Sequence, residues 1–433
     1  MDTVSVFWFR RDLRLEDNAG LWKALRSGHA VLPIFVFDRN ILDKLEDRSD
    51  ARVSFLHDRI TALDQELQAL GSSLKVFYGT PMEAIEALSG AFDVRGVYLN
   101  RDYDPYAGTR DTEVFEYWKA KNVVVVGAKD HVIFEKDEVV KADGTPYLVF
   151  SPYAKMWRKQ LDAYQYKSYP NHKYFDRFHQ CDAFQVPSLA AMNFERTSIE
   201  IPGAAIDTDI IKRYDETRNF PAQNKGTTRL GLHLRFGTIS IRALLRHGLQ
   251  HNDTFVNELI WRDFFQMALY NFPESREKAI KPKYDRIVWE NNEDHFKAWC
   301  KGKTGYPIVD AGMRELNATG HMHNRVRMIV ASFLTKHLLI DWRWGEAYFA
   351  QKLLDFDLAS NIGGWQWASG SGLDAAPYFR VFNPTAQMEK FDKDLRYVRK
   401  WVPELDTHLY PNPIVEHKWA RERCLERFKE GLA

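Results

Sequence analysis

The first 130 residues alternate short apolar runs with longer segments of helical periodicity. The apolar runs cover residues 4–9, 31–37, 74–78, 94–99 and 123–126, and the helical patterns include 52–70 and 82–88. Strands that are apolar along their whole length are typical of parallel sheets covered by helices on both faces. The pattern therefore predicts an α/β domain over residues 1–130, with a parallel, five-stranded, Rossmann-like sheet.

The pattern changes twice further along the chain. Residues 131–205 are rich in Pro, Tyr and polar residues and show no clear period, which is typical of a long connecting segment. From residue 206 the strand signals vanish, and helical periodicity appears over 254–269, 311–316, 323–339 and 346–354. We therefore expect an interdomain linker over 131–205 and an all-α domain over 206–433.

Composition places the chain among globular proteins and argues against several kinds of site. Of the 433 residues, 45% are hydrophobic and 27% are charged, unlike a disordered or fibrous chain. The 3 Cys lie far apart and form no CxxC motif, which argues against a disulfide scaffold, a zinc site or an iron–sulfur cluster. No signal peptide and no apolar stretch of about 18 residues is present. We expect a cytoplasmic protein with no membrane segment.

The net charge of +1 hides an asymmetry between the two ends of the chain. Residues 1–130 carry a net charge of −4 and residues 206–433 a net charge of +5, and 9 of the 13 Trp also lie in 206–433. A basic, aromatic-rich domain is compatible with nucleic-acid binding. A solvated surface above an aromatic core has the same composition, so this feature alone leaves both interpretations open.

Residues 355–384 form the first candidate site, because they are dense in Gly, Asn, Asp and aromatic residues. Asp355 and Asp357 suit hydroxyl or amine groups of a ligand, and Gly363-Gly364 allows close backbone approach. On a helix, Trp365 and Trp367 point about 200° apart, so one can face inward and the other a cavity. The alternative is an irregular buried loop.

A second candidate site is a helix face that carries Glu258, Trp261 and Arg262 at i, i+3 and i+4. A carboxylate, an indole and a guanidinium together can bind a flat aromatic ligand or a nucleobase. The alternative is a surface ion pair beside a core Trp.

Two further clusters carry weaker signals. Asn324, Arg327 and Met328 share a helix face, whereas His321 and His323 are two residues apart, the wrong spacing for a helical zinc pair, and are expected at a helix start or on the surface. Residues 226–231 place hydroxyl residues beside Gly, which suits phosphate oxygens but also an ordinary helix N-cap.

Taken together, these clusters resemble the photolyase/cryptochrome family, and specifically the class I cyclobutane pyrimidine dimer (CPD) photolyases. The resemblance covers nearly the whole chain. It is carried by FWFRRDLRLEDN, NELIWRDFF, GKTGYPIVDAGMRELNATG, HNRVRMIVASFL, DWRWGEAYF and DLASNIGGWQWASGSGLDAAPYFRVFNP, in this order.

The resemblance implies an α/β antenna domain, a linker and a helical domain that binds FAD. It implies light-dependent DNA repair by a deoxyribodipyrimidine photo-lyase. Excited, fully reduced flavin donates an electron to a CPD flipped out of the DNA, and the cyclobutane ring splits. We expect a monomer whose partner is CPD-containing DNA.

The resemblance also assigns residues to the flavin. Arg327 is expected to pair with Asp355 beside the isoalloxazine, and Asn361 to face flavin N5. The other expected cofactor contacts are Tyr214, Thr227, Thr228, Arg229, Leu230, Gly231, Phe356 and Asp357.

For the substrate, the resemblance implies that Glu258 hydrogen-bonds the damaged bases and that Trp261 and Trp367 are the aromatic walls of the pocket. Asn324 and Met328 complete the pocket, and Arg262, Arg380 and, more weakly, Arg218 are expected near DNA phosphates. Trp365, Trp342 and Trp289 match the chain that passes electrons from the surface to the photoexcited flavin.

The sequence departs from the family pattern at four places. Gly231 stands where Ser is frequent, Ile362 replaces a second Asn, and His321 replaces Trp. Tyr106-Ala107 stands where folate-binding relatives often carry Asn-Glu. A second, antenna chromophore is therefore expected to be folate bound differently, a deazaflavin, a flavin, or none.

The sequence also bears on two other functions. A (6-4) photolyase typically has His at the Asn324 and Met328 positions, and this chain has neither. A cryptochrome-type blue-light receptor without repair is the alternative function, but such receptors often replace the equivalents of Glu258, Trp367 or Asn361, all of which are present.

Overall fold

The computed structural model describes residues 1–433, which divide into two compact units. The first unit comprises Met1–Glu135, Leu161–Ile206 and Leu230–His247, and the second comprises Lys136–Gln160, Asp207–Arg229 and Gly248–Ala433. The predicted boundaries at residues 130 and 205 stay a prediction.

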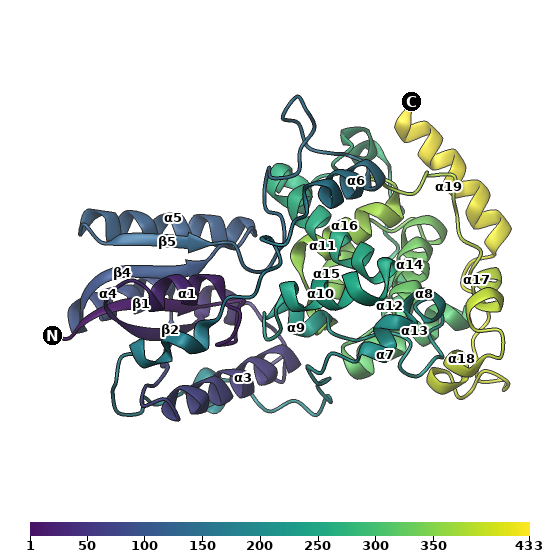
Figure 1. Ribbon diagram of the computed structural model, residues 1–433. Coiled ribbons are helices and arrows are strands. Elements are labelled where there is room, and N and C mark those ends of the chain that lie inside the picture. Colours follow the sequence, from purple (N-terminus) through teal and green to yellow (C-terminus); the bar gives the residue numbers. More distant parts are fainter. The chain divides into compact units, whose positions relative to one another are not determined.

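The first unit is built on a five-stranded parallel sheet, which confirms the predicted fold class (Figure 1). The strand order is β3-β2-β1-β4-β5. Strands β2 and β3 therefore lie on one side of β1, and β4 and β5 lie on the other. The strands are β1 (Thr3–Phe9), β2 (Ala30–Asp38), β3 (Lys75–Gly79), β4 (Asp93–Asn100) and β5 (Val124–Ala128).

The side chains of β1 are apolar on both faces of the sheet, which explains why both faces are buried. Phe7 and Phe9 pack into one apolar cluster, while Val4, Val6 and Trp8 pack into another. Successive strand residues point to opposite faces, so each face has its own core. Helices supply the other half of each core: α1 (Ala19–Leu25), α2 (Arg39–Leu42), α3 (Ala51–Gln68), α4 (Pro81–Ala91) and α5 (Pro105–Ala120).

The helix starts follow local capping chemistry. Asp50 caps α3 by accepting from the Arg52 N–H at 2.8 Å. At α4, Thr80 and Glu83 form a reciprocal capping box. The later parts of the first unit hold the 3₁₀ turns η1 (Asn171–Arg177) and η2 (Ala190–Met192), the helix α9 (Gly231–Arg235) and the start of α10 (Ile241–His251).

The second unit is helical and has no strand (Figure 1). None of its helices, or of the first unit's, is long and apolar enough to span a membrane. Its helices are α6 (Phe150–Gln160), α7 (Thr208–Lys212), α8 (Tyr214–Thr217), α11 (Asp253–Asn271), α12 (Glu293–Cys300), α13 (Pro307–Thr319), α14 (Asn324–Ser332), α15 (Trp342–Lys352), α16 (Leu358–Ser369), α17 (Pro384–Phe391), α18 (Arg396–Trp401) and α19 (His417–Leu432), with the short turns η3 (Pro273–Arg276) and η4 (Pro282–Arg286).

Two elements of the second unit differ from the sequence pattern. Helix α6 lies in the stretch for which no period was predicted. The single helical run expected over 323–339 is instead α14 followed by a π-helical turn, η5 (Phe333–His337). Close packing of α13 on α14 requires Gly312, because a Cβ there would lie 2.4 Å from Val326 Cγ1.

Candidate functional site

Three helices of the second unit bring the predicted motifs together. Helix α11 carries Glu258 and Trp261, α14 carries Arg327, and α16 carries Asn361 and Trp367, and both α11 and α14 pack against α16. The α11–α16 contact is close, because a Cβ on Gly363 would lie 2.2 Å from Phe265 Cδ1. Residues about 100 positions apart in the sequence therefore share one region of this unit.

The structure pairs Arg327 with Asp355, as the resemblance implied. The Arg327 Nη2 donates to the two Asp355 carboxylate oxygens at 3.0 and 3.1 Å, and its Nε donates to the Met322 carbonyl at 2.7 Å. Two anchors fix the guanidinium plane. The site therefore holds a fixed cation beside a carboxylate. This arrangement suits a polar ligand that presents groups of both charge signs.

Asp357 is the N-cap of α16 and accepts from the Ser360 N–H at 3.1 Å. The Gln266 side chain also donates to it, at 3.0 and 3.1 Å. The Gln266 Oε1 is buried and has no hydrogen-bond partner, which is costly unless a ligand supplies a donor. A ligand rich in hydroxyl groups fits this place.

Asn361 is held by a residue that the sequence analysis missed. Its Nδ2 donates to the Glu346 carboxylate at 2.8 Å and to the Glu346 carbonyl at 3.1 Å. Burial raises the pKa of the Glu346 carboxyl, and the bond from Asn361 opposes that shift. With its nitrogen engaged, the amide presents its oxygen as an acceptor. No sequence signal links Glu346 to Asn361, because the two lie on different helices.

Glu258 is paired with Arg218, whose Nη1 donates to Glu258 Oε1 at 2.5 Å. Burial raises the pKa of the Glu258 carboxyl, and Arg218 and Arg325 oppose that shift. Arg218, which was predicted near DNA phosphates, thus also contacts the predicted substrate carboxylate. Arg325 was missed by the sequence analysis, although it lies within the HNRVRM motif.

Trp261 is half-buried in an aromatic group. The ring of Phe150, from α6, stacks on it with centroids 3.8 Å apart and an interplanar angle of 3°. Phe264 meets it edge-on at 5.6 Å and Phe265 is tilted at 5.4 Å. The other wall, Trp367, is also half-buried.

The remaining predicted substrate residues vary in exposure. Asn324 is exposed at the first position of α14, and the Met328 sulfur accepts a weak hydrogen bond from Arg325 at 3.4 Å. Arg380 is exposed in the loop after α16, and Arg262 is half-buried on α11. His323, predicted at a helix start, is the N-cap of α14.

The three predicted electron-chain tryptophans differ in burial. Trp365 and Trp342 are each 2% exposed, whereas Trp289 is half-buried. The Trp365 ring lies against Gly345 of α15, where a Cβ would be 2.1 Å from the ring, and meets Phe349 edge-on at 5.0 Å. Only the indole of Trp289 therefore reaches the surface of this unit.

The predicted phosphate-side stretch is divided between the two units. Tyr214, Thr227, Thr228 and Arg229 belong to the second unit, and burial raises the pKa of the Tyr214 hydroxyl. Leu230 and Gly231 belong to the first unit, where Gly231 begins α9. Phe356 packs against the core of the second unit.

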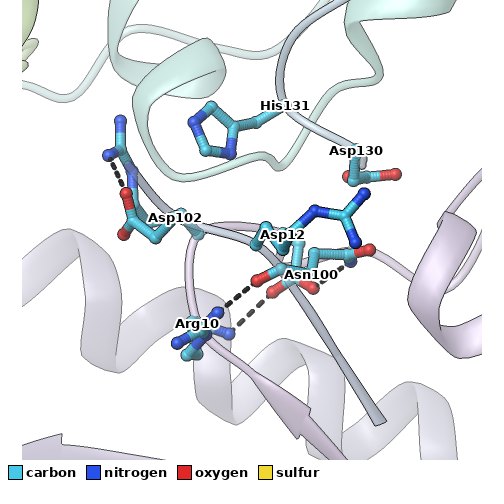
Figure 2. A pocket seen from close by; sticks show the side chains of 8 residues that line it. Arg10, Asp12, Asn100, Asp102, Asp130 and His131 are labelled. Atoms are coloured by element: carbon cyan, nitrogen blue, oxygen red, sulfur yellow. Dashed lines mark hydrogen bonds and ion pairs between the residues drawn. The ribbon is translucent and has the colours of Figure 1, made fainter. Parts of the chain in front are cut away.

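A separate crevice lies in the first unit at the carboxyl ends of β1 and β4, where the strand order changes direction (Figure 2). Asp12 accepts from the Arg10 N–H at 2.6 Å and from Asn100 Nδ2 at 2.5 Å, and Arg11 pairs with Asp102 at 2.9 Å. Burial raises the pKa of Asp12 to about 6. Ligands of parallel α/β sheets bind at such switch points, and here charged side chains bind one another.

No group of three or more His, Cys, Asp or Glu side chains is arranged to hold a metal ion. The polar groups of the site in the second unit are amides, carboxylates and guanidinium groups, which suit an organic ligand with rings and hydroxyl groups.

Comparison with known proteins gives consistent matches over the whole chain. Residues 5–172 match the family model of DNA photolyase, and residues 255–409 match that of the FAD binding domain of DNA photolyase. The deoxyribodipyrimidine photo-lyase of Synechococcus sp. is 38% identical over 95% of this chain and 90% of its own length.

Two solved structures are similar at 34% identity. A class III photolyase from Agrobacterium tumefaciens has a TM-score of 0.89, covering 100% of this chain and 98% of that one. The photolyase of Sulfolobus tokodaii, which holds two FAD molecules, has a TM-score of 0.87 and covers 99% of this chain and 100% of that one.

Proposed function

The chain belongs to the DNA photolyase family, and we propose that Glu258, Trp261 and Trp367 form its pocket for the damaged bases. Its activity is light-dependent DNA repair with FAD, that of a deoxyribodipyrimidine photo-lyase. The substrate is DNA that contains pyrimidine dimers. The class I assignment, a monomeric state and a cytoplasmic location stay predictions.

The packing of α11 and α14 on α16 is the observation that carries the pocket. It supports the proposal that the indoles of Trp261 and Trp367 act as stacking surfaces for the damaged bases, and base–aromatic stacking contributes roughly 1–3 kcal/mol per base. Glu258, which is paired with Arg218, accepts hydrogen bonds from base N–H groups. Exposed Arg380 contacts phosphates.

The flavin side of the site uses Arg327, Asp355, Asp357 and Asn361. FAD, when bound, supplies the light-driven electron transfer that splits the cyclobutane ring. Arg327 compensates negative charge on the ring, while the Asn361 oxygen accepts from a ring N–H. The unpartnered Gln266 Oε1 accepts from a hydroxyl of the ribityl or ribose part.

Trp365, Trp342 and Trp289 serve as the electron chain that keeps the cofactor reduced. Trp365 and Trp342 are buried, so their oxidised forms are shielded from water, and Trp289 has access to external reductants.

The first unit is proposed to take a second, light-harvesting chromophore, which is a folate, a deazaflavin or a flavin. The relative from Sulfolobus tokodaii holds a second FAD that is implicated in light harvesting. The absorption spectrum of the purified protein tests this, because a folate or a deazaflavin adds a band beside that of FAD, whereas a second flavin doubles the flavin absorbance per protein.

Blue-light repair of a CPD-containing oligonucleotide by the purified, reduced protein tests the function. A (6-4) lesion in the same sequence is the control. We expect the CPD to be split and the (6-4) lesion to remain. Failure to split the CPD with reduced flavin present would overturn repair in favour of a photoreceptor.

A further inference from the structure

From the contacts of α6 we infer that Phe150 is a positioning residue of the substrate pocket, which fixes the plane of Trp261 and leaves one indole face for the damaged bases. The inference rests on the proposed function of Trp261. It concerns a residue in the stretch that the sequence pattern predicted as a linker.

The stacking geometry is the first support. The two rings are parallel to within 3° and their centroids are 3.8 Å apart, so Phe150 covers one face of the indole completely enough to exclude another ring. The neighbours on α11, Phe264 and Phe265, meet Trp261 edge-on and tilted. A planar base can therefore stack only on the face opposite Phe150.

Helix α6 is fixed firmly enough to hold that ring. Tyr153 packs on Phe264 at 5.1 Å, and the buried Trp157 Nε1 donates to Asp263 of α11 at 2.9 Å. At the far end of α6, Arg158 pairs with Asp253 at 2.8 Å. These contacts follow α11 over its first three turns, so the position of Phe150 is set by the whole helix pair.

Hydrogen bonds also link the segment around Phe150 to the loop that follows Trp367, the other proposed wall of the pocket. The Asp374 N–H donates to the Leu148 carbonyl at 3.0 Å. Burial raises the pKa of the Asp374 carboxyl, and a hydrogen bond from the Phe150 N–H opposes that shift. Two residues later, the Ala376 N–H donates to the carbonyl of Trp367 at 3.2 Å.

Asp374 adopts a left-handed backbone conformation, with φ of 45°. Asp and Asn tolerate this region better than other residues with a side chain. The loop thus turns back onto the N-terminus of α6 and places a carboxylate there, where the helix dipole favours it. Phe150 is consequently held between the element that carries Trp261 and the loop that follows Trp367.

The test compares F150A, F150L and F150Y with the wild type, all as flavin-loaded full-length protein. Affinity is measured by titration with a CPD-containing oligonucleotide and with its undamaged counterpart. Flavin absorbance per protein and the unfolding midpoint are recorded for each variant. F115A, which removes an exposed aromatic ring from α5, is the matched control.

We expect F150A to bind the CPD oligonucleotide about 2- to 12-fold more weakly and the undamaged one unchanged. F150Y keeps the ring and should retain wild-type affinity. F150L keeps apolar bulk without a ring and should bind like F150A. The near-UV circular dichroism of the stacked pair should be lost in F150A and F150L alone.

Three results overturn the inference. These are an unchanged CPD affinity in both F150A and F150L, equal CPD affinities of F150L and F150Y, and tighter CPD binding by F150A, which would mean that Phe150 occupies the ligand's own face. A wild type that does not prefer the CPD oligonucleotide would instead overturn the proposed function, so the two failures are distinguishable.

Discussion

The Arg218 guanidinium donates to the Glu258 carboxylate at 2.5 Å, and the two residues come from different helical segments of the second unit. Burial raises the pKa of Glu258, while Arg218 is the largest influence that lowers it. The charge of the proposed base-binding carboxylate therefore depends on this one neighbour more than on any other group.

Replacing Arg218 with Gln should shift the pH dependence of substrate binding. Without the guanidinium, the pKa of Glu258 rises further, so the carboxyl takes up its proton at a higher pH. A protonated carboxyl accepts fewer hydrogen bonds from base N–H groups. We expect the acid-side loss of CPD affinity to begin at a higher pH than in the wild type, as measured by titrations between about pH 5 and 8.

Arg213→Gln is the matched control, because Arg213 pairs with Glu216 nearby and both side chains are about two-thirds exposed. In this variant, the acid-side loss of CPD affinity should occur at the same pH as in the wild type. If Arg218→Gln lost CPD affinity at the same pH as the wild type, Glu258 would not govern the pH dependence of binding.

Glu346 should control the redox lifetime of bound FAD through Asn361. Glu346→Ala removes the side-chain acceptor of the Asn361 Nδ2 and leaves only its bond to the backbone carbonyl, so the amide rotates more easily and its oxygen is held less firmly in one direction. We expect the reduced cofactor to be oxidised by air roughly 3- to 10-fold faster, the equivalent of one lost hydrogen bond. The flavin absorbance after the light is switched off reports this rate.

Glu346→Gln provides the comparison, since its side-chain oxygen still accepts from Asn361. It should retain the lifetime of the wild type. Equal acceleration in both variants would instead point to the negative charge of Glu346 rather than to the orientation of Asn361.

The parts of this fold that follow from sequence are those whose signal is local. The strands are short, mostly apolar runs separated by helical segments, so these five runs were sufficient to predict the sheet. Helical spacing alone predicts that Glu258, Trp261 and Arg262 share one helix face. The pairing of Arg327 with Asp355 was expected only from the resemblance, because no spacing rule connects an α14 residue to the loop before α16.

The parts that the sequence pattern missed depend on partners far along the chain. In helix α6, the buried residues Tyr153, Ala154 and Trp157 stand with Phe150 at the i, i+3, i+4 and i+7 positions of a helical period, so a helix signal was present in the stretch predicted as a linker. What the sequence could not show is that α11 packs on this face. The π-helical turn after α14, FLTKH, is buried along its whole length and changes only the hydrogen-bond pattern, which residue spacing does not reveal. Glu346 resembles any other acidic residue of an exposed helix until Asn361 is placed beside it.

Trp365→Phe should slow photoreduction of the flavin and leave repair by chemically pre-reduced enzyme largely intact. Phe is much harder to oxidise than Trp, so the first step of the electron chain is blocked while the substrate pocket is unchanged. Flavin bleaching under blue light and CPD splitting are measured on the same preparation. Equal loss of both activities would contradict the electron-chain role.

Trp299→Phe is the control for this variant, because Trp299 is fully buried and its ring meets Trp365 edge-on at 6.1 Å. It lies outside the proposed chain, so photoreduction should continue at the wild-type rate. A slowed rate in Trp299→Phe would extend the chain to a second branch.

Lys336 should destabilise the folded protein at neutral pH. It is fully buried, its Nζ donates to the Tyr378 carbonyl at 2.9 Å, and the ammonium lies 5.2 Å from the ring centre of Phe428. Burial lowers its pKa from 10.5 to about 8, with Cys424 opposing. The folded state thus binds this proton less tightly than the unfolded state does.

The sign of the pH dependence follows from that difference. Between about pH 8 and 10.5 the unfolded chain holds more protons at this site, so stability gained from a neutral Lys336 appears as the pH rises. Below pH 8 the cost of the buried charge is complete, about 3 kcal/mol for a shift of this size. Lys336→Met removes the charge and also about 1 kcal/mol of hydrogen bonding to Tyr378.

We therefore expect Lys336→Met to raise the free energy of unfolding by roughly 1–2 kcal/mol at pH 7, and this gain to disappear by about pH 10. Denaturant titrations of equally flavin-loaded proteins at the two pH values measure it. Lys297→Met, at a side chain that is 59% exposed, should change little at either pH. A Lys336→Met variant that is less stable by the same amount at both pH values would show that the ammonium is stabilised where it lies, by the Tyr378 carbonyl and the Phe428 ring.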